Sequence, residues 1–383
     1  MRVLILGGDG YLGWPTAMHL AARGCQVCVI DNYLRRKISQ ETDSEPLLVL
    51  PDLEERSRIF DELTGFKIRC VIGDCTDYSF LISVVREFSP DSVVHYAEQP
   101  SAPYSMLDFE SARLTFDNNL RATFNLIWAV QETIPECHII KLGTMGEYGT
   151  PNIDIEEGWL EITHKGRSDR FLFPRQAASL YHTTKILDTD LLWFYVRVNG
   201  LRVTDLMQGP VYGLRTEESE LDEQLSTFFN YDDIFGTVLN RFVTQAVAGV
   251  PLTVYGKGGQ TRGYLNIKDT LQCIELAVKN PPGRGELRVL NQFTEQFSVN
   301  QLAEKVKNAG ESFGLKVEIR SIENPRKEME DHYYNAANSG LFDLGLQPHF
   351  LTEGILIDMM GTVSNNRDRI DRRKILPRVN WKR

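Results

Sequence analysis

The sequence predicts an α/β protein with a doubly wound parallel sheet and a smaller C-terminal α/β lobe. Short apolar runs alternate with helical segments as far as about residue 207, which is the pattern of parallel strands joined by right-handed crossovers. Beyond about residue 208 the alternation loosens, and an acidic stretch with a poor period follows. We therefore expect a sheet domain of residues 1–207 plus about 236–275, and a lobe of about 208–235 and 276–383.

Five apolar runs account for the first strands of the predicted sheet. They are short and carry few charges, as strands buried on both faces of a parallel sheet do. The expected strands are 2–7, 26–30, 67–72, 92–95 and 138–142. Helical periodicity predicts helices at 13–23, 52–63 and 179–194, and in the second half at 238–248 and 299–309. A short strand is expected at 252–255.

The composition excludes several classes of protein. The chain has 383 residues, 42% hydrophobic and 25% charged, so it is an ordinary globular chain rather than a disordered or fibrous one. Its net charge of −10 gives no bulk attraction to nucleic acid. No apolar run reaches the length of a membrane span, and no signal or transit peptide precedes the first strand, which favours the cytosol.

Cys25 and Cys28 have the CxxC spacing of a metal or redox pair. They lie in a predicted strand, which would direct the two thiols to opposite faces, and no second CxxC pair accompanies them. We expect reduced cysteines that pack in the interior, and no metal site.

A glycine-rich turn follows the first predicted strand. Gly7, Gly10 and Gly13 stand between that strand and a helix, where such glycines let helix N-terminal amides meet a pyrophosphate. Asp31 ends the second strand, 18 residues after Gly13, where a carboxylate accepts the hydroxyls of an adenosine ribose and repels a 2′-phosphate. The pattern predicts a Rossmann-type domain that binds NAD. The glycine spacing also resembles the extended branch of the short-chain dehydrogenase/reductase superfamily.

Three nearby residues bear on this cofactor site. Arg35 and Arg36 closely follow Asp31 and favour NADP, but we give Asp31 more weight and interpret the arginines as pyrophosphate or loop contacts. Asp74 follows the third strand and resembles the adenine-contacting Asp of the superfamily, although it could instead cap the next helix.

A tyrosine and a lysine stand four residues apart in a helical context. Tyr181 and Lys185 therefore project from one helix face. The ammonium group would lower the pKa of the phenol, and the tyrosinate could then take a proton from a sugar hydroxyl while a hydride leaves. Thr144 ends the fifth strand and offers a hydroxyl to the same oxygen, unless it only caps a turn. His182 is either a chemical group or a structural histidine.

The positions after Thr144 distinguish between classes of enzyme. Sugar-nucleotide 4,6-dehydratases of the superfamily place Asp-Glu there, whereas this chain has Met145 and Gly146. The acid–base pair of a standard dehydratase is therefore missing. Glu147, one position later, could replace it only through altered geometry.

A glycine-rich basic segment at 255–264 offers a site for a second anion. It resembles the nucleotide-sugar segment of extended superfamily members, in which Arg262 would bind a diphosphate in bidentate fashion and Tyr255 would line the base. Arg326 resembles the second diphosphate arginine of these enzymes. An ordinary surface loop is the alternative for both arginines.

Four longer runs resemble the UDP-sulfoquinovose synthase family. They are LGTMGEYGTPNIDIEE at 142–157, LTVYGKGGQTRGY at 252–264, NQFTEQFSVN at 291–300 and HYYN at 332–335. The resemblance covers nearly the whole chain and implies UDP-glucose and sulfite as substrates, with bound NAD recycled. Oxidation at C4 by Thr144, Tyr181 and Lys185 would precede loss of the C5 proton and C6 hydroxyl, with Glu147 or His182 as acid or base. Sulfite would then add at C6, and hydride would return to C4.

The resemblance also implies the other site residues. Those expected to contact NAD are Gly7, Asp9, Gly10, Tyr11, Leu12, Gly13, Asp31, Asn32, Tyr33, Arg35, Arg36, Asp74, Cys75, Tyr96, Ala97, Asn118, Tyr181, Lys185, Gln208 and Val211. Those expected to contact the sugar nucleotide are Thr144, Tyr181, Gln208, Thr237, Asn240, Thr253, Val254, Tyr255, Gln260, Arg262 and Arg326. One departure is Pro100, where the family has a substrate-side arginine, for which Arg175 or a rearranged loop could compensate.

Two other functions share part of this evidence. A UDP-glucose 4-epimerase or 4,6-dehydratase would share the fold, the cofactor and C4 oxidation, but the missing Asp-Glu pair argues against the dehydratase. A non-catalytic NAD-binding regulator could share the fold, but the intact Thr144, Tyr181 and Lys185 argue against it. We expect a homodimer, as is common in the superfamily, with no nucleic-acid or membrane partner.

Overall fold

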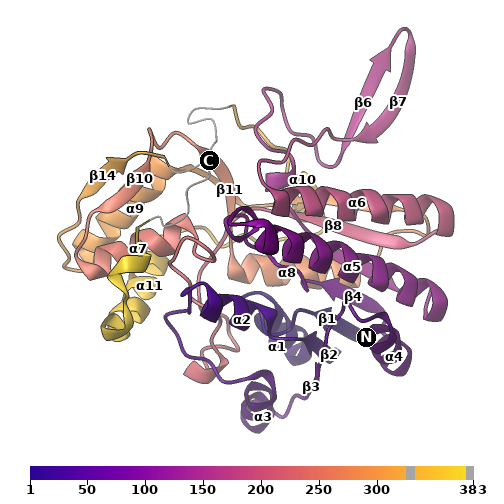
Figure 1. The fold of residues 1–383 in the computed structure, drawn as a ribbon, viewed down its shortest axis with the longest axis horizontal. Helices are drawn as coiled ribbons and strands as arrows, with labels where there is room; N and C mark the ends of the chain where they lie inside the picture. Colours follow the sequence, from indigo (N-terminus) through magenta and orange to yellow (C-terminus); the bar gives the residue numbers. More distant parts are fainter. Residues whose placement is uncertain (325–332, 377–383) are drawn as a thin grey trace.

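A seven-stranded parallel sheet forms the centre of the protein in the computed structural model, which describes residues 1–324 and 333–376 (Figure 1). The strand order is β12-β8-β5-β4-β1-β2-β3, and every neighbouring pair is parallel. The strands are β1 (Arg2–Leu6), β2 (Gln26–Asp31), β3 (Ile68–Ile72), β4 (Ser92–His95), β5 (His138–Thr144), β8 (Arg202–Gln208) and β12 (Leu287–Gln292). The doubly wound parallel sheet predicted from the sequence is confirmed.

Helices cover both faces of this sheet. One apolar core joins it to α4 (Tyr78–Phe88), α5 (Phe109–Thr133) and α6 (Leu180–Asn199). A second core, on the other face, joins it to α1 (Gly13–Ala22), α3 (Leu53–Thr64) and α8 (Ile267–Lys279). A short helix, α2 (Leu34–Glu41), follows β2. The helix α6 begins after Ser179, whose hydroxyl accepts a hydrogen bond from the His182 amide at 3.2 Å, and this cap fixes where the Tyr181 turn starts.

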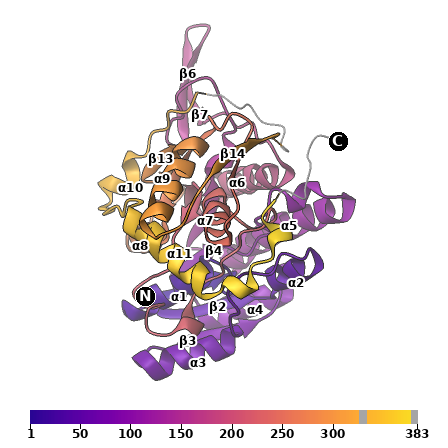
Figure 2. The same cartoon turned by 90° about the vertical axis from the view of Figure 1, so that its left-hand side faces the viewer.

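The lobe has an apolar core of its own. Three helices form it, α7 (Val238–Ala248), α9 (Val299–Ser312) and α11 (Glu353–Asn365), together with the parallel pair β10 (Leu252–Tyr255) and β14 (Ile319–Ile322). A mixed sheet links the lobe to the loops after β8 and contains β9 (Val211–Tyr212), β11 (Thr261–Asn266) and β13 (Glu295–Ser298). The short α10 (Ser339–Asp343) packs against β12. Figure 2 shows the lobe from the side on which α9 and α11 lie.

The boundaries of the two parts differ from the predicted division. The strand β12, expected in the lobe, is the edge strand of the central sheet and pairs with β8 from Leu287 opposite Val203 onward. Conversely, α7 and β10, expected with the sheet, pack in the core of the lobe. Strand pairing across the chain decides these memberships, and a local sequence pattern does not report it.

A hairpin that the sequence analysis did not predict projects from the body (Figures 1 and 2). It consists of the antiparallel strands β6 (Trp159–His164) and β7 (Arg167–Leu172). Lys165 and Gly166 connect them and both have positive φ, as a two-residue type I′ turn requires.

The cysteines agree only in part with the expectation of reduced residues that pack in the interior, because Cys25 is half-buried. All six are free, and Cys28 is buried in β2 while Cys25 precedes that strand. No cluster of potential metal ligands occurs among the described residues. No helix within 1–324 or 333–376 is long and apolar enough to cross a membrane.

Candidate active site

A cavity of about 760 Å³ lies at the carboxyl ends of the central strands and reaches into the lobe. Its lining comes from the loops after β1, β2, β3, β4, β5 and β8, and from lobe segments around 232–241 and 255–264. The chain leaves β1 toward β2 on one side and returns to β4 on the other, so the cavity opens where the strand order reverses. In open α/β sheets this position is the usual ligand site.

The glycine turn after β1 forms one wall of the cavity. A Cβ atom on Gly7 would lie 2.8 Å from the Tyr96 carbonyl carbon, and one on Gly13 would collide with the Gly7 carbonyl oxygen. Both positions therefore require glycine to keep the turn close to the neighbouring backbone. The turn leads into α1 with its backbone against the cavity, which fits the pyrophosphate of a dinucleotide.

Asp31 lies where a ribose-binding carboxylate is expected. It ends β2 and lines the cavity, and its two oxygens accept hydrogen bonds from the amides of Asp9 at 2.9 Å and Tyr33 at 2.7 Å. Burial, helped by the nearby Asp9 charge, raises the pKa of Asp31 to about 6. The side chain is thus fixed in place, and it titrates close to neutral pH.

The two arginines after Asp31 have different positions. Arg36 donates to both Asp9 oxygens, at 2.7 and 2.8 Å, and does not line the cavity. Arg56 pairs with the same carboxylate. Arg36 therefore contacts neighbouring loops, as one of the two interpretations has it. Arg35 does line the cavity, where it donates to Asn230 at 2.8 Å.

Asp74 also lines the cavity, and the helix-cap alternative for it is wrong. The carboxylate accepts hydrogen bonds from Asn32 at 3.0 Å and from the Thr76 amide at 2.8 Å. The cap of α4 is Asp77, which accepts from the Phe80 amide. The expected cofactor residue Tyr33 lies outside the cavity, because its hydroxyl accepts from the Leu53 amide.

The other expected cofactor residues line the cavity, with the exception of Lys185, which is described below. They are Gly7, Asp9, Gly10, Tyr11, Leu12, Gly13, Asn32, Cys75, Tyr96, Ala97, Asn118, Gln208 and Val211.

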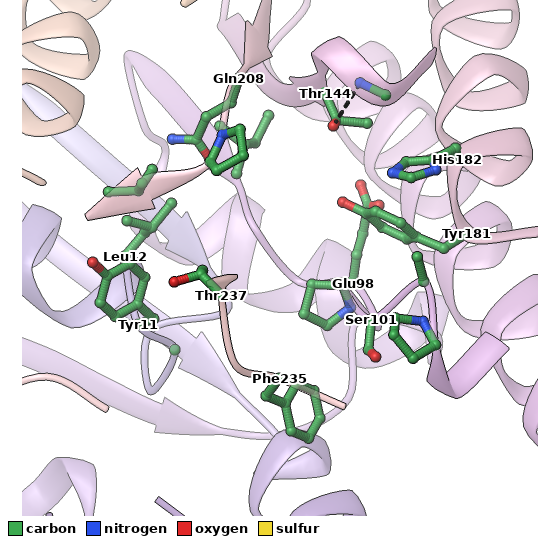
Figure 3. Close-up of a pocket in the computed structure, with 18 of the residues that line it drawn as sticks. Tyr11, Leu12, Glu98, Ser101, Thr144, Tyr181, His182, Gln208, Phe235 and Thr237 are labelled. Atoms are coloured by element: carbon green, nitrogen blue, oxygen red, sulfur yellow. Dashed lines mark hydrogen bonds between the residues drawn. The ribbon is translucent and has the colours of Figure 1, made fainter. Parts of the chain in front are cut away.

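One end of the cavity, where β5 ends, holds Thr144, Tyr181 and His182 (Figure 3). We call this part of the cavity the sheet end. Thr144 ends β5, and its hydroxyl accepts from the Gly146 amide at 3.1 Å. Tyr181 and His182 stand in the first turn of α6, and the His182 ring is held by the Ser179 hydroxyl, 3.0 Å from Nδ1. A Cβ atom on Gly146 would collide with the other edge of this ring, so glycine at 146 makes room for His182.

Lys185 is not where the sequence analysis expects it to act. Its ammonium group forms a buried ion pair with Glu98, and it does not line the cavity. Burial lowers the pKa of Lys185, but the charges of Glu98 and Asp188 and the hydrogen bond to Glu98 together raise it, so Lys185 is an ammonium ion at neutral pH. Burial, followed by the charges of Glu98 and Glu147, raises the pKa of Tyr181. The expected lowering by Lys185 is wrong for this arrangement, because Glu98 neutralises the ammonium charge.

Glu147 points away from the cavity, so the acid–base role considered for it is wrong. It is completely buried and pairs with Lys141 at 3.1 Å and Arg175 at 3.2 Å. Its carboxylate also accepts from the Thr144 amide at 3.2 Å, which completes a capping box around the turn after β5. Thr144-x-x-Glu147 is the sequence signature of this motif and could have revealed it. Arg175 is held here too, so it does not compensate for Pro100, which lines the cavity.

The lobe end of the cavity holds part of the expected sugar-nucleotide set. Thr237, Tyr255, Gln260 and Arg262 line it. Three other expected residues do not: Asn240 donates to the Asn230 carbonyl, Thr253 is bonded to Gln245, and Val254 is in the core of the lobe. Thr253 and Tyr255 share one face of β10, and only Tyr255, the last residue of the strand, reaches the cavity. Arg326 lies outside the described residues.

Sequence reasoning missed many residues of the cavity wall, among them Arg241, Ser101, Phe235 and Glu98. Arg241 lines the cavity with its guanidinium 4.0 Å from the centre of the Tyr255 ring. Ser101 and Phe235 lie opposite Thr237 in Figure 3, and Glu98 stands beside Tyr181. Arg241 lies within an apolar helix and the other three in loops, so no motif in the sequence marks them.

Comparison with known proteins identifies the family. The model of the NAD dependent epimerase/dehydratase family matches residues 3–291. The chain is 50% identical over 382 residues to the UDP-sulfoquinovose synthase, chloroplastic, of Spinacia oleracea, covering 100% of this chain and 79% of the spinach protein. It is 48% identical over 387 residues to the UDP-sulfoquinovose synthase of Sulfolobus acidocaldarius, covering 100% of this chain and 98% of that protein. The chain belongs to the UDP-sulfoquinovose synthase family. It is an enzyme, and its cofactor is NAD.

More distant relatives share the fold of this UDP-sulfoquinovose synthase family member. The UDP-glucose 4-epimerase of Bifidobacterium longum, solved with NAD+ and UDP, superimposes with a TM-score of 0.71 at 19% identity, covering 97% of this chain and 100% of that one. The Thermus thermophilus UDP-glucose 4-epimerase, solved with NAD, superimposes with a TM-score of 0.66 at 23% identity, covering 97% of this chain and 100% of that one. These structures show the same Rossmann-type architecture.

Proposed function

We propose that this chain converts UDP-glucose and sulfite to UDP-sulfoquinovose, using bound NAD that is regenerated in each cycle. The observation that carries the proposal is the cavity itself. At one end Thr144, Tyr181 and His182 converge, and Met145 and Gly146 stand where a dehydratase has its acid–base pair. At the other end Arg241, Arg262 and Tyr255 offer charge and an aromatic face to a nucleoside diphosphate.

The residues at the sheet end would carry out the oxidation at C4. Tyr181 takes the proton of the C4 hydroxyl, and the Thr144 hydroxyl binds the same oxygen. NAD, when bound, supplies the hydride acceptor. Lys185 lies behind the cavity lining, paired with Glu98, and His182 faces the same space as Tyr181. The resulting 4-ketone acidifies the proton at C5, which prepares the loss of the C6 hydroxyl and the addition of sulfite.

Product formation tests the proposed function. Purified protein incubated with UDP-glucose, NAD and sulfite should give a sulfonated sugar nucleotide detected by mass spectrometry. Omitting sulfite should abolish that mass gain. An epimerase would instead accumulate the C4 epimer without sulfite, and a 4,6-dehydratase would accumulate a 6-deoxy-4-keto sugar. Either result from folded, NAD-loaded protein would overturn the proposal.

The titration of Asp31 predicts a pH dependence of NAD binding. The ribose hydroxyls need the carboxylate as acceptor, and the pKa of Asp31 is raised to about 6. NAD affinity should therefore be highest above pH 6 and fall as pH drops through that value, by up to about tenfold per pH unit for one proton. Isothermal titration calorimetry between pH 5 and 8 measures this slope. Asp31→Asn should bind NAD weakly with a flat profile, and a profile as steep as that of the wild type would exclude Asp31 as the titrating group.

We also propose a homodimer formed through α5 and α6. Apolar side chains stay exposed on both helices of the monomer: Phe116, Phe124 and Trp128 on α5, and Leu187, Phe194 and Val198 on α6. Exposure ranges from 37% for Leu187 to 63% for Val198. The two helices pack side by side, and exposed apolar side chains gathered on neighbouring helices are typical of a protein interface.

A charge placed in this patch should separate the dimer. Phe124→Glu is expected to elute as a monomer in size-exclusion chromatography with light scattering, because an unpaired carboxylate would be buried in the interface. Phe66→Glu, a similarly exposed phenylalanine near β3, is the matched control and should stay dimeric. A dimeric Phe124→Glu variant would place the interface elsewhere.

A further inference from the structure

The proposed reaction needs a proton acceptor for C5 and a proton donor for the C6 oxygen. A standard dehydratase supplies both from the two positions after its threonine, but this chain has Met145 and Gly146 there. The nearby Glu147 is buried in ion pairs behind the turn. The group that performs this step must therefore come from another element of the cavity wall.

Six carboxyl groups line the cavity in the described part of the chain. Asp9, Asp31 and Asp74 follow β1, β2 and β3 and lie at the dinucleotide end. Asp232 and Asp233 belong to the lobe segment that precedes Thr237. Glu98 is the remaining one. It follows β4, and it shares the sheet end of the cavity with Tyr181.

The side chain of Glu98 is held through one carboxylate oxygen, and its other oxygen has no hydrogen-bond partner among the described residues. The side chain is 4% exposed, and its Oε1 atom accepts a hydrogen bond from the Lys185 ammonium group. The Oε2 atom is buried and has no hydrogen-bond partner among the described residues. A buried oxygen without a hydrogen-bond partner is unfavourable, more so when it carries charge. Glu98 and Tyr181 line the same part of the cavity (Figure 3), and burial, followed by the charge of Glu98, raises the pKa of Tyr181.

We propose that Glu98 is the acid–base residue of the dehydration step. This proposal rests on the proposed function. The Oε2 atom of Glu98 takes the C5 proton of the 4-keto sugar. The electron pair of the C5–H bond forms the C5–C6 double bond, and the C6–O bond breaks. The leaving hydroxyl takes the proton back from Glu98 and departs as water, which restores the carboxylate. In the addition step, hydrogen sulfite passes its proton to Glu98, sulfur attacks C6, and Glu98 protonates C5.

The charges around Glu98 suit both halves of this step. His95 faces it from β4 at 3.8 Å, with its pKa lowered to about 3 by burial, so it is neutral. Lys185, Tyr181 and Asp188 face it from α6, and Lys141 and Glu147 contribute from β5 and the following turn. Burial raises the pKa of Glu98, against the opposing charge of Lys185. A carboxyl group with a raised pKa is a stronger base when ionised and still able to return the proton near neutral pH.

Solvent deuterium at C5 reports this step separately from oxidation at C4. Wild-type protein with UDP-glucose and NAD in D2O, without sulfite, should show reduction of bound NAD by absorbance. The recovered UDP-glucose should carry deuterium at C5, detected by NMR. Glu98→Gln should lose C5 exchange and sulfonated product by about 10²-fold or more, the usual contribution of an acid–base group. Its NAD reduction should fall by much less, because Tyr181, Thr144 and Lys185 are kept.

Two matched variants complete the test. Glu98→Asp keeps the carboxyl group and should recover part of the C5 exchange. His182→Gln removes the rival acid–base group at this end of the cavity, and its loss of C5 exchange should be smaller than that of Glu98→Gln. Wild-type exchange in Glu98→Gln, or loss of exchange in His182→Gln alone, would overturn the proposal. An equal loss of NAD reduction and exchange in Glu98→Gln would also overturn it, and would make Glu98 a positioning residue for Lys185. Wild-type protein that reduces NAD but makes no sulfonated product would instead refute the proposed function.

Discussion

Tyr181→Phe is expected to slow the oxidation of UDP-glucose by about 10²- to 10⁴-fold, the range of a lost acid–base group. Phenylalanine fills the same space in the first turn of α6 and removes only the hydroxyl that faces the cavity. Transient absorbance of bound NAD after mixing with UDP-glucose measures this step directly. NAD binding itself should stay within about twofold, because the glycine turn and Asp31, which we propose bind the dinucleotide, lie at the other end of the cavity.

The matched control for this variant is Tyr148→Phe. Tyr148 lies in the same region, but it is completely buried and its hydroxyl donates to Asn291 at 2.9 Å, away from the cavity lining. It should oxidise UDP-glucose at nearly the wild-type rate. Wild-type oxidation by Tyr181→Phe would remove Tyr181 from the proton transfer at C4. A loss of NAD binding in Tyr181→Phe would indicate instead that the substitution disrupts the structure of the site.

Lys141→Met is expected to destabilise the fold by about 3–5 kcal/mol. Lys141 is completely buried in β5, and its ammonium group contacts Glu147 at 3.1 Å, Asp205 at 3.2 Å and the Thr189 hydroxyl at 2.6 Å. Methionine has a similar length and leaves the two carboxylates without this cation inside the protein. Such uncompensated charge is among the largest single-residue effects on stability. Equilibrium unfolding in urea measures the change in the free energy of unfolding.

A surface lysine provides the comparison. Lys279 pairs with Glu275 at the end of α8 and is 61% exposed, so Lys279→Met should change the free energy of unfolding by less than about 1 kcal/mol. Similar changes in the free energy of unfolding for the two variants would show that the buried carboxylates near Thr144 do not need Lys141 to compensate their charge. The turn that presents Thr144 would then owe its position to backbone contacts alone.

The sheet and the dinucleotide end of the site could be predicted because their signals are local. A buried apolar strand, a glycine turn and a carboxylate at the end of the next strand stand close together in the sequence, and Gly7, Gly13 and Asp31 line the cavity as expected. The same holds for Thr144, Tyr181 and His182, which end or begin regular elements. Local sequence sets where such elements start, so residues at their ends are placed correctly.

The remaining site residues depend on tertiary packing that local patterns do not contain. Glu98 follows a four-residue strand, and only the packing of α6 against that loop brings it to Lys185. Thr253 and Tyr255 lie on the same face of β10. Tyr255 reaches the cavity because it ends the strand, whereas Thr253 is bonded to Gln245. The edge strand β12 joins the sheet through pairing with β8, more than 80 residues earlier. Glu147 is different, because the sequence contains the signature of its structural role, the capping-box spacing Thr144-x-x-Glu147.

The most direct test of the whole reaction uses UDP-glucose with deuterium at C4, sulfite, and one equivalent of NAD bound to the enzyme. The proposed reaction predicts many turnovers without added NAD and a product that carries the sulfonate and keeps the deuterium at C4, because the same hydride is removed and returned. Mass spectrometry reads both features in one spectrum. A product that has lost the C4 deuterium, consumption of one NAD per product, or formation of product that does not depend on sulfite would contradict it.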